Sequence, residues 1–173
     1  MPTEISGSTG VNKIQDNTIV NADINSSAAI AGSKISGGTG KVLQAITAID
    51  TGSWANSSNS FQDTNLSVTI TPTSTSNKIL IIASVSYSSN LNGSNNGLRL
   101  VRGSTDLTGH QIYSLTIDGG GSYQRGVWSW HHLDSPSTTS ATTYKVQAGH
   151  NTNGNAITLH AANDSITVME IAG

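Results

Sequence analysis

The sequence predicts an all-β protein, a jelly-roll-like β-sandwich preceded by an extended N-terminal arm. Three observations favour this fold class. Only 10% of the residues are charged, 18 are glycines, and Ser, Thr and Asn are abundant. β-Branched apolar residues are spread over many short stretches rather than over long helical segments. Turn signals separate these stretches about every 8–14 residues, a spacing typical of a sandwich or a jelly roll.

The composition also excludes several classes of function. The formal net charge is only −2 and the 8 Lys and Arg residues form no basic cluster, so we expect no nucleic-acid partner. No apolar run approaches the roughly 18 residues of a membrane helix, so we expect no membrane insertion. The N-terminal stretch MPTEISGSTG lacks the basic and apolar regions of a secretion signal. Cysteine is absent, which excludes disulfides and thiolate chemistry.

Residues 1–40 form a separate region, the N-terminal arm, which ends in the glycine-rich joint 37–40. Isoleucine recurs there about every five residues, which matches neither a helix nor a half-buried strand. Such sparse apolar groups cannot close a core, so we expect the arm to dock on a partner or to wind with copies of itself. Three copies that turn these isoleucines toward a common axis would gain about 1.5–3 kcal/mol for each one buried. The candidate attachment and trimer residues are Ile14, Ile19, Ile24, Ile30 and Ile35.

The second region, residues 41–173, contains the predicted strands. Residues 42–46 open a strand, whereas residues 54–60, WANSSNS, are expected to form a loop. In residues 66–70, apolar side chains alternate with Ser and Thr, which predicts a half-buried strand. Pro72 ends this strand because proline cannot donate a hydrogen bond to the ladder.

The continuous apolar run at residues 79–82 predicts a buried central strand that continues to Tyr87. Asn-Gly pairs at 90–97, and Asp118 with the glycines at 119–121, predict turns. No segment has a helical period longer than one or two turns. The remaining strands are expected at 98–101, 112–117, 123–133, 144–148, 157–159 and 166–171.

Two groups of sequence blocks, taken together, resemble one protein family. The first is the N-terminal pattern IxDNTIxNADIxxxAAIAxSKI. The second is the set TITPTSTSNKILI, LRLVRGST, HLDSPSTTSATTYKV and SITVMEIAG. These blocks, which extend from Ile14 to Ala172, are similar to short tail-fibre or virion-appendage proteins of tailed bacteriophages, in particular those of marine and cyanobacterial phages.

The resemblance implies a homotrimer located in the virion. Residues 1–40 would attach it to other virion proteins, and residues 41–173 would face outward. The outer loops at 90–97, 118–122 and 150–155 are then candidates to meet a host cell-surface glycan. A long shaft, which most tail fibres have, is nearly absent. A short fibre, a fibre tip and a capsid decoration or cement protein all remain open.

An aromatic cluster at 123–132 is the best candidate for a receptor surface. On a strand, Trp128, Trp130 and His132 share one face, and Tyr123 lies nearby in sequence. Tryptophan and histidine suit stacking on sugars and hydrogen bonding to them. The alternative is that both tryptophans fill the core or a subunit interface.

Metal sites have little support in the sequence, and none is predicted. His131, His132, His150 and His160 could supply one imidazole per chain on a threefold axis, but scattered surface or interface histidines explain them as well. The aspartates beside turns lack the loop pattern of a Ca²⁺ site, so we expect them to cap turns. These aspartates are Asp106, Asp118 and Asp134.

Enzymatic function and cofactors are not expected. No GxSxG elbow is present, and the glycines at 119–121 precede neither a helix start nor a lysine, so they form a turn rather than a phosphate cradle. Glu170 lies in the last strand, where a buried carboxylate needs a partner, and Arg99 or Arg102 is the expected one. A polysaccharide depolymerase or esterase domain is kept as the enzymatic alternative.

Overall fold

The computed structural model describes residues 41–50, 52–58, 60–90, 96–108, 123–150, 157–160 and 164–173. The predicted N-terminal arm with its five isoleucines lies outside these residues, as do the predicted strand 112–117 and the predicted turn 118–121. The side chains of Tyr123 and His150 also lie outside what the structure describes.

Every regular element among the described residues is a β-strand, which confirms the all-β prediction. The strands are β1 (Val42–Asp50), β2 (Trp54–Asn56), β3 (Gln62–Ile70), β4 (Lys78–Asn90), β5 (Asn96–Arg102), β6 (Thr105–Asp106), β7 (Tyr123–Asp134), β8 (Thr142–His150), β9 (Ile157–Leu159) and β10 (Asp164–Ile171).

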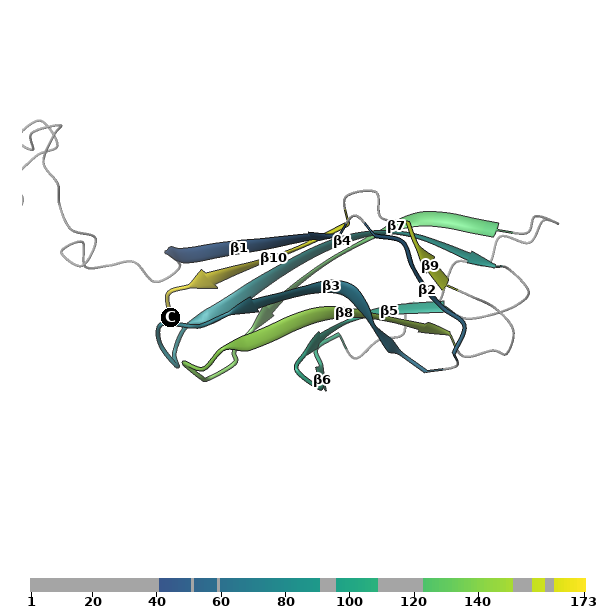
Figure 1. The fold of residues 1–173 in the computed structure, drawn as a ribbon. Coiled ribbons are helices and arrows are strands. Elements are labelled where there is room, and N and C mark those ends of the chain that lie inside the picture. Colours follow the sequence, from purple (N-terminus) through teal and green to yellow (C-terminus); the bar gives the residue numbers. More distant parts are fainter. Residues whose placement is uncertain are drawn as a thin grey trace, which may run out of the picture. The chain divides into compact units, whose positions relative to one another are not determined.

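The strands form two antiparallel sheets packed face to face, so the predicted sandwich is confirmed (Figure 1). Sheet A has the order β1-β10-β4-β9-β2, with β7 also paired to β4, and sheet B has the order β3-β8-β5-β6. The long strand β4 pairs with β7 along nearly its whole length, and its other edge pairs first with β10 and then with β9. Sheet A is therefore four strands wide in most places, because β9 continues the line of β10 and β2 continues that of β1.

The pairing is nested along the chain. β1 and β2 pair with β10 and β9, β3 pairs with β8, and β4 pairs with β7. Successive segments also alternate between the sheets, since β1 and β2, β4, β7, and β9 and β10 belong to sheet A while β3, β5 and β6, and β8 belong to sheet B. A long hairpin that is rolled up on itself produces such an order.

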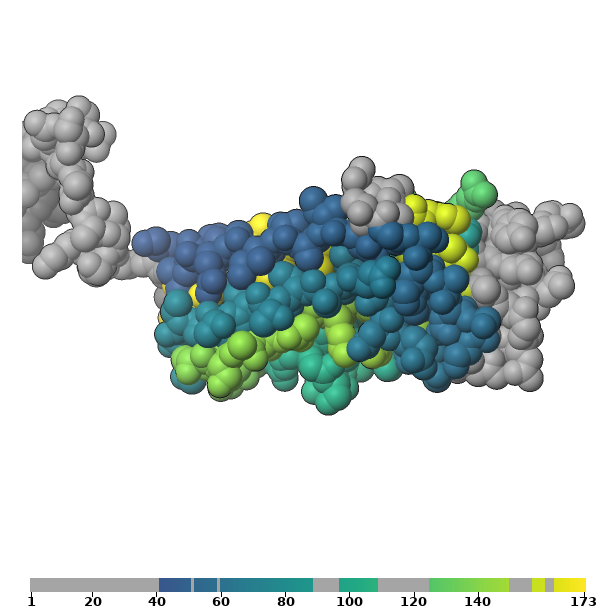
Figure 2. Space-filling view, viewed as in Figure 1, coloured from purple at the N-terminus to yellow at the C-terminus, as the bar shows by residue number. Residues whose placement is uncertain are grey.

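The core lies between the sheets because apolar residues alternate along the strands. On β3, Leu66, Val68 and Ile70 are buried while Ser67 and Thr69 are exposed, as the alternation predicted. Each fully buried Val, Leu or Ile contributes about 1.5–3 kcal/mol relative to exposure. Sheets A and B also meet at their edges, where β1 lies against β3 (Figure 2). The cluster is completed by Ile79, Ile81, Ala83, Val85, Leu98, Leu100, Trp128, Tyr144, Val146, Ala148, Ile157, Leu159, Ile166 and Val168.

Two local predictions were wrong. Residues 54–56 form strand β2 rather than a loop, because Trp54 packs against the core and the backbone pairs with β9. The apolar run at 79–82 is a central strand as predicted, but it is not buried throughout. Ile79 and Ile81 face the core, whereas Ile82 points to the other side of sheet A and is 41% exposed.

Candidate functional site

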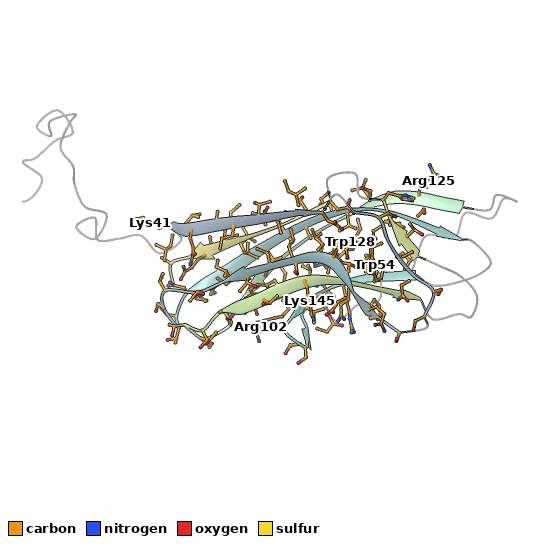
Figure 3. All side chains as sticks on the ribbon, viewed as in Figure 1. Lys41, Trp54, Arg102, Arg125, Trp128 and Lys145 are labelled. Carbon is orange, nitrogen blue, oxygen red and sulfur yellow. The ribbon has the colours of Figure 1, made fainter. Side chains whose placement is uncertain are left out.

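The predicted aromatic cluster lies on β7, at an edge of sheet A. In the pairing with β4, Trp128 is opposite Val85 and Trp130 is opposite Ala83, so both indoles project from the face that carries the core residues. Their rings stack with centroids 6.2 Å apart and an interplanar angle of 2°. Figure 3 shows Trp128, with Trp54, between the two layers.

Burial separates the two tryptophans. Trp128 is only 5% exposed and belongs to the core, and its buried indole N–H has no hydrogen-bond partner. Trp130 is 37% exposed, and His132 is half-buried beside it on the same face. The receptor-surface prediction therefore concerns Trp130 and His132, and it stays a prediction.

The opposite side of sheet A is the most unusual surface among the described residues, and we call it the outer face of sheet A. A row of apolar side chains crosses its four strands, since Leu133 is opposite Leu80, Leu80 is opposite Met169, and Met169 is opposite Ala45. The large apolar residues exposed on this face are Val42, Ile49, Ile82, Val127 and Leu133. Other strand positions of this face include Ile171 and the polar residues Thr47, Ser84, Ser86, Ser129, His131, Ser165 and Thr167.

Charged groups are sparse on the outer face of sheet A. Among its described strand residues none is acidic, and the cations Lys78 and Arg125 lie at opposite ends of the β4–β7 pair. Figure 3 shows Arg125 at the end of β7, away from the sandwich centre. The central part of this face therefore has apolar, hydroxyl and imidazole groups.

The outer face of sheet B is polar. Arg99 donates to Gln147 at 2.8 Å, pairs with Asp106 at 3.2 Å and stacks over the Phe61 ring at 4.3 Å. Lys145 and Gln147 both donate to Asp63, and these bonds lower the pKa of the Asp63 carboxyl. Sheet B thus has an ordinary water-facing surface, and the two faces of the sandwich differ in kind.

Glu170 does not pair with an arginine, and that prediction was wrong. Arg99 and Arg102 belong to sheet B, whereas the Glu170 carboxylate is fully buried at the inner side of β10. It accepts hydrogen bonds of 2.6 Å from the Gln44 and Asn77 side-chain amides, and of 2.6 and 2.8 Å from the Thr73 N–H and hydroxyl. Burial disfavours the charged form, but the bonds from Asn77, Gln44 and Thr73 outweigh it and lower the pKa of Glu170 to about 2.

Asp134 is not a turn cap, contrary to the prediction for this residue. It is the buried last residue of β7, and it accepts bonds of 2.7 and 2.8 Å from Arg102 and of 2.7 Å from the Tyr144 hydroxyl. Burial and the contact with Asp134 raise the pKa of Tyr144 well above its ordinary value. Asp106 does cap a turn, since its carboxylate accepts from the Thr108 N–H at 3.0 Å, and Asp118 is outside the described residues.

The histidines whose side chains the structure describes do not converge. His131 lies on the outer face of sheet A and His132 on the opposite side of β7, while His160 contacts the Ser88 hydroxyl at 2.6 Å. The part of the chain that the structure describes contains no group of three or more His, Cys, Asp or Glu side chains placed to hold a metal ion. It also contains no helix of the length and hydropathy needed to span a membrane.

The sequence contained a signal for the outer face of sheet A that the strand prediction did not use. In an antiparallel sheet with one wet face, apolar residues alternate with polar ones. The unbroken run at 79–82 indicates instead that both sides of β4 are apolar.

In comparisons with known proteins, no family model matches the chain and no curated protein matches it significantly.

Proposed function

We propose that this chain is a non-enzymatic structural protein of a tailed-phage virion, a short homotrimeric fibre whose residues 1–40 attach it to other virion proteins. The resemblance of the sequence blocks supports the virion assignment. The main support for an oligomer is the contrast between the two outer faces, since that of sheet A is apolar and that of sheet B is polar.

The strand order supports a finer description of the sandwich as a jelly roll. In that fold, a long hairpin is rolled so that paired strands fall alternately into two sheets. The nested pairing and the alternation between sheets A and B follow this scheme. Jelly rolls recur in viral capsid and lectin domains, which agrees with the proposal but is an analogy of fold alone.

Second and third copies of the chain are the proposed occupants of the outer face of sheet A. Four strands spaced about 4.8 Å apart and some ten residues long, at about 3.4 Å per residue, give a face of roughly 600 Å². Three such faces turned toward a common threefold axis would bury roughly 600 Å² per chain and roughly 1,800 Å² in the whole trimer. Self-contact brings together no acidic side chains of the described strands, so little like-charge repulsion opposes it.

The proposed fibre would meet its host through the exposed edge of β7, which carries Trp130 and His132. The half-exposed Trp130 ring, held in place by its stack on Trp128, presents an apolar plane of the kind that stacks on a sugar. His132 on the same face adds a hydrogen-bonding group. A host surface glycan is therefore the proposed ligand.

Oligomeric state tests the proposal most directly. In the full chain, Ile82→Asp puts a charge in the centre of the outer face of sheet A, whereas the control Ser67→Asp puts the same charge on the exposed side of β3. Light scattering after size exclusion should give a trimer for the unchanged chain and for the control. We expect Ile82→Asp to raise the dissociation constant about 100-fold or more, because an unpaired charge would be buried. A monomeric unchanged chain at micromolar concentration would contradict the oligomer.

The place on the particle needs a second experiment. Antibody labelling of purified virions, read by electron microscopy, should mark the tail, and labelled protein should bind host cells. Labelled capsids, together with protein that stabilises stripped capsids and does not bind cells, would assign a decoration protein instead. New reducing ends or acetate released from host polysaccharide would contradict the non-enzymatic part of the proposal.

A further inference from the structure

Two neighbouring strands of sheet A are interrupted at the same level. β1 ends at Asp50 and its line resumes with β2 at Trp54, while β9 ends at Leu159 and its line resumes with β10 at Asp164. Because β1 pairs with β10 and β2 with β9, the two interruptions lie side by side. Asp50 and Asp164 are opposite each other in the last pair before the gap.

Only one of the two oxygens of the Asp164 carboxylate accepts hydrogen bonds. Its Oδ1 accepts hydrogen bonds of 2.7 Å from both the N–H and the hydroxyl of Ser86 on β4. The residue is 2% exposed, and its Oδ2 is buried without a hydrogen-bond partner. A buried charged oxygen with no partner is strongly unfavourable, so this atom needs a ligand.

Asp50 provides a second carboxylate on the neighbouring strand, at the position opposite Asp164. Its Oδ1 accepts a 2.9 Å bond from the Gly52 N–H, which leaves its other oxygen free of any described hydrogen bond. Directly opposed residues of antiparallel strands have Cβ atoms about 4.5–5.5 Å apart, and like charges there repel. The ion pairs among the described residues use Asp63, Asp106 and Asp134, so no described basic side chain forms an ion pair with Asp50 or Asp164.

We propose that Asp50 and Asp164 together bind a Ca²⁺ ion. Calcium takes oxygen ligands at about 2.3–2.6 Å and tolerates irregular geometry, so carbonyls and waters can complete a shell begun by two opposed carboxylates. Zinc and copper favour nitrogen and sulfur ligands, and magnesium requires a nearly ideal octahedron. With two carboxylates the affinity falls in the range of weak calcium modules, a Kd of about 10⁻⁴–10⁻³ M. The ion would hold the two interrupted strand lines together and does not depend on the proposed virion role.

Thermal unfolding of the full chain tests the site. The protein is stripped with chelator and then titrated with CaCl₂, with MgCl₂, and with NaCl at matched ionic strength. Calcium at about ten times its Kd should raise the Tm by about 4–8 °C, and sodium should not. Magnesium should be several-fold weaker than calcium. Calorimetry should give one calcium ion bound per chain.

Variants decide whether the two aspartates are responsible. Asp50→Asn and Asp164→Asn should each abolish the calcium response, while the control Asp106→Asn, on sheet B, should keep it. Asp50→Asn should also raise the Tm of the calcium-free protein, because it removes the like-charge repulsion while an amide oxygen still accepts from Gly52. A calcium response that persists in Asp50→Asn, or its absence in the unchanged chain, would overturn the site.

Discussion

The Asp134 carboxylate on β7 accepts a 2.7 Å hydrogen bond from the Tyr144 hydroxyl on β8, so a buried polar contact joins the edge of sheet A to the middle of sheet B. Arg102 of β5 completes the contact with two bonds to the same carboxylate. Apolar packing alone specifies the relative position of two sheets loosely. A charged bond with fixed geometry selects one position.

The contribution of this contact can be separated by substitution. Tyr144→Phe keeps the ring in the core and removes one bond to a charged group, so we expect a loss of about 1.5–3 kcal/mol in the free energy of unfolding. Asp134→Asn removes the charge that accepts all three bonds, so we expect a loss of about 2–4 kcal/mol. This is less than for a fully buried pair because Arg102 is partly exposed. Urea unfolding measures both losses. The double variant should lose less than the sum, and strict additivity would contradict a shared contact.

Glu170 predicts a specific dependence of stability on pH. Its folded-state pKa of about 2 lies below the ordinary value of 4.5. The ionised group therefore stabilises the fold fully above about pH 4.5, and this stabilisation is lost as the pH falls through the folded pKa. In Glu170→Gln, the new side-chain N–H₂ group cannot accept a hydrogen bond from a donor such as the Gln44 amide. We therefore expect this substitution to lower the free energy of unfolding by about 1–3 kcal/mol at neutral pH.

The measurement is the free energy of unfolding in urea from pH 6 down to the lowest pH at which the protein stays folded. The unchanged chain should lose stability steeply below about pH 4.5, and the curve of Glu170→Gln should be flatter. Asp63→Asn is the control, because Asp63 lies on the surface of sheet B and should leave most of the slope in place. Equal slopes for both variants would refute the role of Glu170.

The stacked indoles predict a clear division of effects. Trp128→Ala removes a buried core side chain and should cost about 3–5 kcal/mol. Trp130→Ala should cost less, about 1–3 kcal/mol, because it removes the stacking and a side chain that is 37% exposed, but it should abolish the proposed binding to host cells. Urea unfolding and a cell-binding assay give the two readouts. Unchanged cell binding by folded Trp130→Ala would remove Trp130 from the receptor surface.

Local pattern was enough to predict the fold class and several strands. The alternation at 66–70 identified β3 because one side of that strand is wet, and the apolar run at 79–82 identified β4 as central. The short strand at 54–56 was missed because Ser and Asn surround a single large apolar residue, Trp54, and pairing with β9 decides its conformation. Tertiary contact here overrides local composition.

The polar contacts could not be predicted, because their partners are far apart in sequence. Glu170 meets Gln44 across 126 positions and Asn77 across 93, and no spacing rule encodes either distance. Charge alone suggested an arginine as the partner of Glu170, but the topology puts Arg99 and Arg102 in the other sheet. The residues of the outer face of sheet A are likewise visible only once the register of four strands is known.

Two adjacent isoleucines on β4 separate folding from assembly. Ile81 is fully buried in the core, so Ile81→Ala should cost about 2–5 kcal/mol at any protein concentration. Ile82 lies on the outer face of sheet A, so Ile82→Ala should cost less than about 1 kcal/mol at a concentration where the chain is monomeric. At concentrations where copies associate, the cost of Ile82→Ala should rise because its side chain is then buried between chains. Urea unfolding at two concentrations that differ at least 100-fold measures this difference. If Ile82→Ala costs as much as Ile81→Ala in the monomer, the outer face of sheet A is already covered within a single chain. If the cost of Ile82→Ala stays small at both concentrations, other copies do not pack against this face.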